Sequence, residues 1–405
     1  MKTSRGHITY CTNIHPGENW PDHFAQLKQH FPPIKQAVSP NAPMGIGLRL
    51  SNIASLQLDD AEALQLFNTW LLQNDAYVFT MNGFPYGGFH HTVVKDQVHA
   101  PDWLTTERVQ YTKRLFNILA ELLPIGMDGG ISTSPLSYRL WFNGQLALAH
   151  ATTIATHHIL EIVEHLAELE NSTGKIMHLD IEPEPDGILE SGVEFIEWYT
   201  KVLLPIGLQY LKLNMGVDVI EAERLIKTHV RLCYDICHFA VGYENHGEVM
   251  QHLQNNGILV GKLQVSAALK ANLHGYVAER SAIKTAFEPF NESTYLHQVV
   301  AKTTSEGFKR YADLPNALAD VNNPQVTEWR AHFHVPIFER DFGVLQSTQS
   351  DITEVMQLHT TRQQTNHIEI ETYTWEVLPL QIQLPLQQSI VREIQWLFNT
   401  LDVTL

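Results

Sequence analysis

Cysteine is scarce in this chain, with only three among 405 residues, at positions 11, 233 and 237. Cys233 and Cys237 lie four residues apart around Asp235, so the sequence offers neither a C-x-x-C pair nor enough cysteines for a disulfide framework or a cysteine zinc site. Long apolar runs are missing too. No stretch of about 18 apolar residues could span a bilayer, and the first residues have no apolar signal core. We therefore expect a cytoplasmic protein.

Positive charge is also in short supply, because 27 Lys and Arg face 44 Asp and Glu and leave a formal net charge of −17. A groove that follows a phosphate backbone needs clustered basic side chains, so nucleic acid is not expected as a partner. A small metabolite, including an anionic one, remains compatible, since a local Arg or backbone N–H groups can bind it. Hydrophobic residues make up 44% of the chain, enough for a large core.

Short β-type runs recur along the chain and alternate with segments long enough for a helix, which predicts βαβ units and a parallel sheet. There are eight such runs: 7–14, 44–52, 76–82, 175–182, 230–238, 260–266, 331–338 and 367–373. Eight parallel strands predict an α/β fold of a single (β/α)8 barrel over residues 1–405, with long loops at its carboxyl face. A mixed insertion at about 267–326 is expected to form a cap.

Acids and histidines gather in four of the predicted strands. The segments are His178-Leu-Asp180-Ile-Glu182, Tyr234-Asp235-Ile-Cys-His238, His332-Phe-His334 and Glu369-Ile-Glu371. In three of the four segments, polar and apolar residues occupy alternate positions. Because successive side chains of a strand point to opposite faces, each of these three strands has one polar and one apolar face. Catalytic ligands of (β/α)8 barrels come from the carboxyl ends of several strands, where these groups would converge.

A divalent metal is the expected cofactor of this predicted site. Glu182, Asp235, Gln264 and Glu371 offer oxygen ligands that suit Mn, Mg or Zn. Counting the predicted strands, Glu182 ends the fourth and Glu371 the eighth, on opposite sides of the ring. Two carboxylates so placed could move a proton at a carbon next to a carbonyl, while the metal polarises that carbonyl. This is the chemistry of aldose/ketose isomerases and epimerases.

Three histidines, His238, His332 and His334, admit two interpretations. They could hold a second metal ion, or they could hydrogen-bond substrate hydroxyls and one another. His178 and Asp180 lie one layer below Glu182 and are expected to be buried hydrogen-bond partners rather than ligands. Glu184, in the Pro-bounded turn beyond the strand, is an alternative ligand or a loop carboxylate.

Two loops are candidates for substrate binding. The stretch from Gly129 to Arg139 carries Ser132, Ser134 and Arg139, which could cradle a phosphate or another anion. Asn82 opens an aromatic loop and could line a substrate pocket, although aromatic loop residues more often pack locally. These residues complete the predicted site.

The order Glu182, Asp235-x-x-His238, Gln264, His332-x-His334, Glu371 resembles the xylose isomerase-like TIM barrel superfamily of sugar isomerases, sugar epimerases and endonuclease IV enzymes. The resemblance implies a metal held by Glu182, Asp235, position 264 and Glu371. Position 264 is Gln where the epimerases have His, and an amide oxygen binds most transition metals less strongly than imidazole does. The endonuclease branch uses its D-x-x-H histidine and a D-x-H pair for additional zinc, and the pair reads His332-x-His334 here.

Further motifs are similar to those of the EboE metabolite-traffic proteins within this superfamily. They are Asn82-Gly-Phe-Pro-Tyr-Gly, Val94-Lys95, Pro101-Asp-Trp103, Ile131-Ser-Thr-Ser-Pro-Leu-Ser137, His332-Phe-His-Val-Pro336 and Glu371-Thr-Tyr-Thr-Trp375 with Leu378-Pro379. This resemblance implies a protein that handles a secondary metabolite or its precursor, with membrane or gene-cluster proteins as partners.

Three functions follow as hypotheses. The leading one is a metal-dependent isomerase or epimerase that acts on a small polar metabolite, with Glu182 and Glu371 as ligands and acid/base pair. The alternative is a non-catalytic protein that binds and passes on a metabolite. A phosphodiesterase of the endonuclease IV type is disfavoured by the acidic composition.

Overall fold

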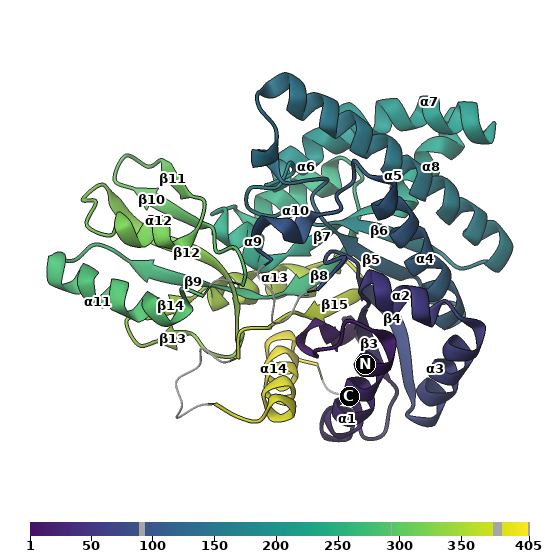
Figure 1. Cartoon of the computed structure of the whole chain (residues 1–405), viewed down its shortest axis with the longest axis horizontal. Helices are drawn as coiled ribbons and strands as arrows, with labels where there is room; N and C mark the ends of the chain where they lie inside the picture. Colours follow the sequence, from purple (N-terminus) through teal and green to yellow (C-terminus); the bar gives the residue numbers. More distant parts are fainter. Residues whose placement is uncertain (89–93, 293, 376–382, 404–405) are drawn as a thin grey trace.

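A ring of parallel strands forms the centre of the molecule in the computed structural model, which describes residues 1–88, 94–292, 294–375 and 383–403. Eight strands make the ring (Figure 1): β2 (Gly6–Tyr10), β3 (Met44–Arg49), β4 (Ala76–Asn82), β5 (Gly129–Thr133), β6 (Met177–Ile181), β7 (Val230–Asp235), β8 (Val260–Val265) and β15 (His367–Ile370). Each neighbouring pair from β3 round to β2 is parallel and hydrogen-bonded. The predicted (β/α)8 barrel is confirmed.

The ring closes between β2 and β3 through a short seam. Cys11 and Gly47 form one parallel bridge there. The Thr9 hydroxyl, inside the seam, donates to the Gly45 carbonyl at 2.8 Å and accepts from the Gly47 N–H at 3.2 Å. A side chain therefore supplies hydrogen bonds that backbone pairing supplies elsewhere in the barrel.

Helices surround the barrel in an outer layer. They are α1 (Trp20–Val38), α2 (Asn52–Leu58), α3 (Ala61–Gln73), α4 (Thr106–Leu122), α5 (Gln145–Thr173), α6 (Gly192–Trp198), α7 (Leu204–Met215), α8 (Val219–His229), α9 (Ile236–Val241), α10 (His246–Asn255), α13 (Gln349–Thr361) and α14 (Leu386–Leu401). Several begin at a residue whose side chain accepts a first-turn N–H: Asn19, Ser51, Asp60, Ser191, Asp218 and Asn245. Such caps satisfy N–H groups that have no partner within the helix and so fix where each helix starts.

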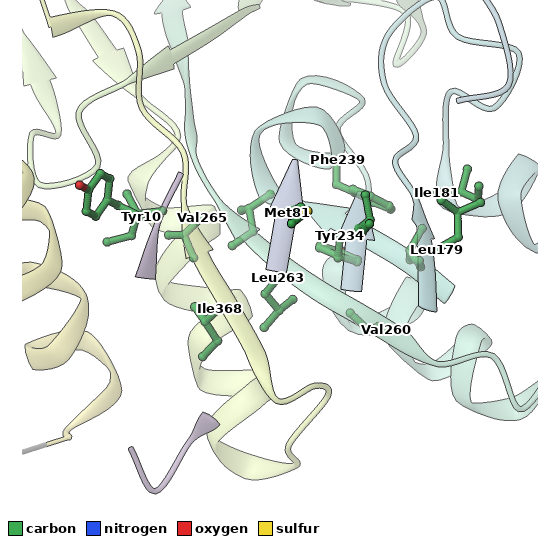
Figure 2. Packing of buried hydrophobic residues seen from close by; sticks show 14 of the residues in the cluster. Tyr10, Met81, Leu179, Ile181, Tyr234, Phe239, Val260, Leu263, Val265 and Ile368 are labelled. Atoms are coloured by element: carbon green, nitrogen blue, oxygen red, sulfur yellow. The ribbon is translucent and has the colours of Figure 1, made fainter. Parts of the chain in front are cut away.

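Apolar side chains fill the space between strands and helices, whereas much of the barrel interior is polar. Figure 2 shows part of the apolar packing, including Leu179, Ile181, Leu263 and Ile368 from strands of the ring. Residues of the opposite parity face the bore, where (β/α)8 barrels more commonly hold branched apolar side chains. The polar character of the bore follows from the alternation of acids with Leu and Ile along the strands.

Glycines make room for the interior carboxylates. A Cβ built at Gly47 would lie 1.8 Å from Glu369 Oε1, and one at Gly261 would lie 1.8 Å from Asp180 Oδ1. Any side chain at either position would collide with a buried acid, so the polar interior depends on these two residues.

One of the eight predicted strands is wrong and one was missed. Segment 331–338 is not a barrel strand. Its β part belongs to β12 (Val326–Val335), which pairs antiparallel with β9 (Ala267–Asn272) and β10 (Val299–Thr303). The missing strand is β5, in a segment interpreted as a hydroxyl-rich loop because two glycines begin it. Gly130 is required there, since a Cβ would lie 2.4 Å from the His178 ring.

A second, six-stranded sheet is inserted between β8 and α13, in the order β11-β10-β12-β9-β14-β13. Its other elements are α11 (Val277–Phe287), β11 (Phe308–Tyr311), α12 (Leu314–Ala319), β13 (Asp341–Phe342) and β14 (Leu345–Ser347). Figure 1 shows this sheet beside the barrel, in green. The predicted insertion at 267–326 forms most of it, and its role as a cap stays a prediction.

The remaining elements are short. They are β1 (Lys2–Thr3), the π-turn Tyr199–Leu203 and the 3-10 turns Thr12–Ile14, Lys95–His99, Arg139–Trp141 and Glu288–Phe290. Within the described ranges, no helix has both the length and the apolar character needed to cross a bilayer. Leu378 and Pro379, quoted above as part of a motif, lie outside the described residues.

Candidate metal centre

Three carboxylates meet at the carboxyl ends of the strands. Asp235 ends β7, Glu182 directly follows β6, and Glu371 directly follows β15. One oxygen from each lies within 4.8 Å of the others, and all three side chains are buried. The structure therefore brings together three of the four residues predicted as ligands of one metal.

Gln264, the fourth predicted ligand, points its amide nitrogen into this cluster. Its Nε2 donates to Glu182 Oε1 at 2.9 Å, to Asp235 Oδ2 at 2.7 Å and to Glu371 Oε2. An NH2 group has two hydrogens, so it cannot satisfy three acceptors at once. Glu182 Oε2 has no hydrogen-bond partner among the described residues. The cluster thus has more acceptors than donors.

The four residues come from consecutive positions in the ring, β6, β7, β8 and β15. Because β5 is the fourth barrel strand, Glu182 follows the fifth and not the fourth. The prediction that Glu182 and Glu371 lie opposite each other is therefore wrong, since only β7 and β8 separate their strands. The acids line one side of the mouth and converge from there.

Electrostatics set the protonation of the cluster. Burial raises the pKa of Glu182 well above its usual range, and the charges of Asp235 and Glu371 raise it further. Burial also acts to raise the pKa of Asp235, but His238, His334 and hydrogen bonds from Ser266 and Gln264 outweigh it and lower that pKa. Of these two acids, Asp235 is the more readily ionised and Glu182 the more readily protonated.

Glu371 is held by two amides. Asn13 and Asn82 donate to its Oε1 at 2.6 and 2.8 Å. The Asn82 side chain is fixed in turn by the N–H of Phe84, which donates to its Oδ1 at 3.1 Å. Sequence reasoning placed Asn82 in the substrate loop and missed Asn13, although Asn13 lies at the end of the first predicted strand, where polar residues of this barrel point into the mouth.

The three predicted histidines also meet here. His238 Nε2 lies 3.0 Å from His332 Nε2, and His334 Nε2 lies 3.9 Å from Asp235 Oδ2. His332 and His334 reach the mouth from β12, so the second sheet completes a site that the barrel begins. Burial lowers the pKa of His334, but Tyr373 and Asp235 outweigh it and raise that pKa well above the ordinary value.

The outer nitrogens of two of these rings are fixed by carbonyl oxygens. His238 Nδ1 donates to Pro183 O at 2.9 Å, and His332 Nδ1 donates to Gln298 Oε1 at 2.9 Å. The Gln298 amide cannot be reversed freely, because its Nε2 donates to Pro185 O at 2.9 Å. Both rings therefore turn their Nε2 atoms toward each other.

The donor set fits a divalent cation. Three buried carboxylates and a cationic His334 leave two negative charges, which an ion such as Mg²⁺, Mn²⁺ or Zn²⁺ would neutralise. The free Glu182 Oε2 and the excess of acceptors around Gln264 are the features that such an ion would satisfy. Reversing the Gln264 amide would present its oxygen in place of its nitrogen, and which metal is preferred stays open.

A pocket of about 610 Å³, including solvent at its open side, lies over the carboxylates. Its lining combines the polar groups of the mouth with Phe84, Tyr295, Leu296 and Tyr373. Glu184 lies in its wall, 2.7 Å from His99, and one of its oxygens lies within 4.8 Å of ring nitrogens of His238 and His332, so it stays an alternative ligand.

The predicted anion cradle has a different arrangement. Ser132 lies in the bore below the mouth, where its hydroxyl accepts from Lys262 Nζ at 3.0 Å. Ser134 is buried, and its hydroxyl has no hydrogen-bond partner among the described residues. Arg139 donates to Glu194 at 2.6 Å and lies 3.5 Å from Glu190. Its charge is already balanced by two acids, and anion binding by these three residues stays a prediction.

A buried ion pair lies beneath the carboxylates. Lys262 Nζ donates to Glu369, and both side chains are fully buried. Burial alone would lower the pKa of Lys262, but Glu369 outweighs it and raises that pKa above the ordinary value. Sequence reasoning placed Glu369 one layer below Glu371 and missed Lys262, since a lysine in a predicted strand gives no signal of its interior position.

Comparison with known proteins gives structural neighbours only, since no protein-family model and no curated protein matches the chain. A D-tagatose 3-epimerase-like protein is 10% identical, with 98% of this chain and 97% of that one covered and a TM-score of 0.47. An IOLI protein with a binding zinc atom is 10% identical over 98% of both chains, with a TM-score of 0.44. A xylose isomerase-like TIM barrel protein from Mycobacterium smegmatis, in complex with magnesium, is 11% identical over 72% of this chain and 88% of that one, with a TM-score of 0.40.

These neighbours are described as epimerase-like and xylose isomerase-like proteins, the superfamily that the sequence motifs resemble. A particular closeness to the EboE proteins stays a prediction. Since all three TM-scores lie below 0.5, the metal and the reaction of this protein have to be inferred from its own side chains.

Proposed function

We propose that this protein is a metal-dependent isomerase or epimerase of a small sugar-like carbonyl compound. The observation that carries the proposal is the convergence of Glu182, Asp235 and Glu371, with ligand atoms within 4.8 Å of one another under a pocket of about 610 Å³. Glu182, Asp235, Glu371 and the Gln264 amide would hold the metal. When bound, the metal polarises the substrate carbonyl as a Lewis acid.

The chain's own carboxylates would move the proton. Glu371 is oriented by the Asn13 and Asn82 amides, which place its carboxylate to accept a proton from the carbon next to the carbonyl. Glu182, whose pKa burial raises, can return a proton to that carbon or to its neighbour. One proton leaves and one is added, so the conversion needs no oxidant or reductant.

The histidines and the second sheet would bind the rest of the substrate. His238, His332 and His334 line the pocket beside the acids and present ring nitrogens to hydroxyl groups. Tyr373, stacked on His334 with ring centroids 4.7 Å apart, adds an apolar wall. This polar and aromatic lining favours a compact polyol over an extended polymer.

Solvent deuterium exchange tests the proposal. Chelator-treated protein is reloaded with Mn²⁺, Mg²⁺ or Zn²⁺ and incubated in D2O with a panel of aldoses, ketoses and their phosphates, with NMR detection. We expect deuterium beside the carbonyl of at least one compound, and at least a 100-fold loss of exchange in Glu371→Gln and Glu182→Gln. Glu197→Gln is the control, since that acid pairs with Lys201 on an exposed helix face. Absence of exchange from the whole panel with metal-loaded protein would contradict the proposal.

A specific observation favours a second candidate function, a metabolite-binding protein of the EboE type. The Gln264 amide nitrogen lies within hydrogen-bond distance of all three carboxylates, so it can donate to two of them without a cation. Such a protein would hold a secondary-metabolite precursor in the pocket and pass it to a membrane or gene-cluster partner. Ligand-induced thermal shifts that are equal with and without metal, and unchanged by Glu371→Gln, would support this function over catalysis.

A further inference from the structure

A second cluster of metal-ligating side chains lies at the other end of the barrel. His178 is the second residue of β6, His367 begins β15, and Asp128 directly precedes β5. These are the amino ends of the strands, whereas Glu182 and Glu371 follow the carboxyl ends of β6 and β15. One atom each of His178, His367 and Asp128 lie within 4.8 Å of one another. The cluster is therefore separate from the mouth.

Three of the four histidine ring nitrogens of this cluster have no hydrogen bond among the described residues. Both rings are fully buried, and His178 Nε2 and both nitrogens of His367 have no hydrogen-bond partner among the described residues. Burial of an imidazole nitrogen without a partner costs stability. Two such rings side by side, with centroids 5.2 Å apart, need an explanation.

The three groups lie close enough to share one ion. His178 Nε2 lies 3.6 Å from Asp128 Oδ2, and His367 Nε2 lies 3.4 Å from Asp128 Oδ1, so each ring faces a different oxygen of the carboxylate. One ligand atom from each residue lies within 4.8 Å of the others, whereas two ligand atoms on a tetrahedral zinc ion lie roughly 3.3–3.4 Å apart. A central ion would therefore draw these side chains closer together.

The surrounding contacts are those that support metal ligands. His178 Nδ1 lies 2.6 Å from Asp180 Oδ1, which fixes the ring and leaves Nε2 as the free donor. Metal-binding histidines commonly donate their other N–H to a carboxylate in this way. Arg231 donates to Asp128 Oδ2 at 3.2 Å and orients that carboxylate, although its positive charge also weakens the attraction for a cation.

An ion could reach the cluster from solvent. The Asp128 side chain is 24% exposed and the Arg231 side chain 12%, while the two histidines lie behind them. Three protein ligands with a water molecule in the fourth place make a common zinc geometry.

We propose that Asp128, His178 and His367 form a zinc site at the amino end of the barrel, independent of the metal centre at the mouth. The ion would connect β6 with β15, two strands that are separated in the ring by β7 and β8. It would thereby cross-link the base of the barrel across its bore. The site needs two imidazoles and one carboxylate, and so it favours zinc or cobalt over magnesium.

Cobalt titration of the full chain tests this site. Co²⁺ in a tetrahedral environment absorbs visible light strongly, so spectrum and stoichiometry can be read together. The parent protein carries Glu182→Gln, Asp235→Asn and Glu371→Gln, which disable the mouth carboxylates. We expect His367→Gln in this parent to bind one equivalent of Co²⁺ fewer and to lose the tetrahedral absorption that the parent shows.

Two further variants keep the test decisive. Asp128→Asn, at a partly exposed position, should lower cobalt affinity at least 100-fold and serves if His367→Gln fails to fold. His229→Gln is the matched control, because that buried histidine is engaged with Met177 O at 2.7 Å and Glu170 at 3.1 Å. Unchanged stoichiometry and spectrum in Asp128→Asn, with the control behaving like the parent, would overturn the proposal whatever the mouth binds.

Discussion

Both ends of the barrel contain clustered acids and histidines, but the two clusters differ in composition. At the mouth, three carboxylates converge on the amide of Gln264 beneath an open pocket. At the base, two buried imidazoles face the single carboxylate of Asp128. Oxygen-rich sites suit hard ions such as Mg²⁺ or Mn²⁺, whereas sites with imidazole ligands suit Zn²⁺ or Co²⁺. The side-chain composition therefore predicts different ion preferences at the two ends.

The buried ion pair that lies between the two ends should give the largest effect of any substitution considered. Lys262 pairs with Glu369 inside the bore, so Lys262→Met leaves a carboxylate buried and unpaired. We expect the free energy of unfolding to fall by about 3–5 kcal/mol. Urea unfolding of the full chain measures it. The double variant Lys262→Met with Glu369→Leu should recover most of the loss, and failure to recover would show that the pair does more than balance charge.

The rim of the mouth should respond to pH through Glu393, a buried acid of α14 whose pKa burial raises to about 8. Its Oε1 accepts from Thr372 Oγ1 at 2.8 Å and from the Ile337 N–H at 3.0 Å. The folded protein keeps this proton between pH 4.5 and 8 while the unfolded chain releases it, so stability falls as pH rises through that window.

Glu393→Gln should remove this slope, and the variant should be more stable than the wild type at pH 8 by about 4 kcal/mol. Thermal unfolding at several pH values measures the difference. Parallel pH profiles for the two proteins would contradict the assignment.

A smaller effect is expected from Gln264→His, which replaces the amide with an imidazole among the three carboxylates. Zinc or cobalt affinity at the mouth should rise on the order of tenfold, since imidazole is the stronger ligand for these ions. Calorimetric titration measures the change. The base site should bind as before, and an equal rise at both ends would undo the distinction between them.

Asn82→Ala gives the smallest expected change at the mouth. The substitution removes one of two amides that hold Glu371 Oε1, and Asn13 remains. Metal affinity should fall by several-fold, up to about tenfold, which is the lower range for losing a support of a metal ligand. Asn82→Asp, similar in size but unable to donate, should weaken binding no less if the lost donor is the cause.

Much of the fold followed from the sequence because period-two alternation was strong. The acids of β6 and β15 alternate with Leu and Ile, and this parity placed Glu182 and Glu371 at one edge of a parallel sheet. The alternation of His332 and His334 was equally clear, but it does not specify which sheet a strand joins, so β12 was assigned to the barrel. Strand β5 was missed because Gly129 and Gly130 carry no side chains to reveal a pattern.

The candidate site was predictable where it lies at strand ends and obscure where it depends on contacts across the barrel. Asp235 could be located because it ends a strand. Other contacts depend on which strands become neighbours, and that is fixed only when the ring closes. They are the hydrogen bonds of the Gln264 amide, the hydrogen bond from Asn13 to Glu371 and the contacts of Lys262 inside the bore. His178 and Asp180 do hydrogen-bond to each other, as expected of buried partners, whereas Gln264 is the residue that bonds to Glu182.

The facing nitrogens of His238 and His332 have a consequence for ligand binding. Each ring donates its outer N–H to a carbonyl oxygen, so two neutral rings would oppose two lone pairs at 3.0 Å. A ligand hydroxyl that enters the pocket can donate to one of these lone pairs and so relieve their opposition. The pair therefore favours a ligand that brings hydrogen-bond donors to this wall over one that brings only acceptors, and a deoxy analogue that lacks the donor should bind more weakly.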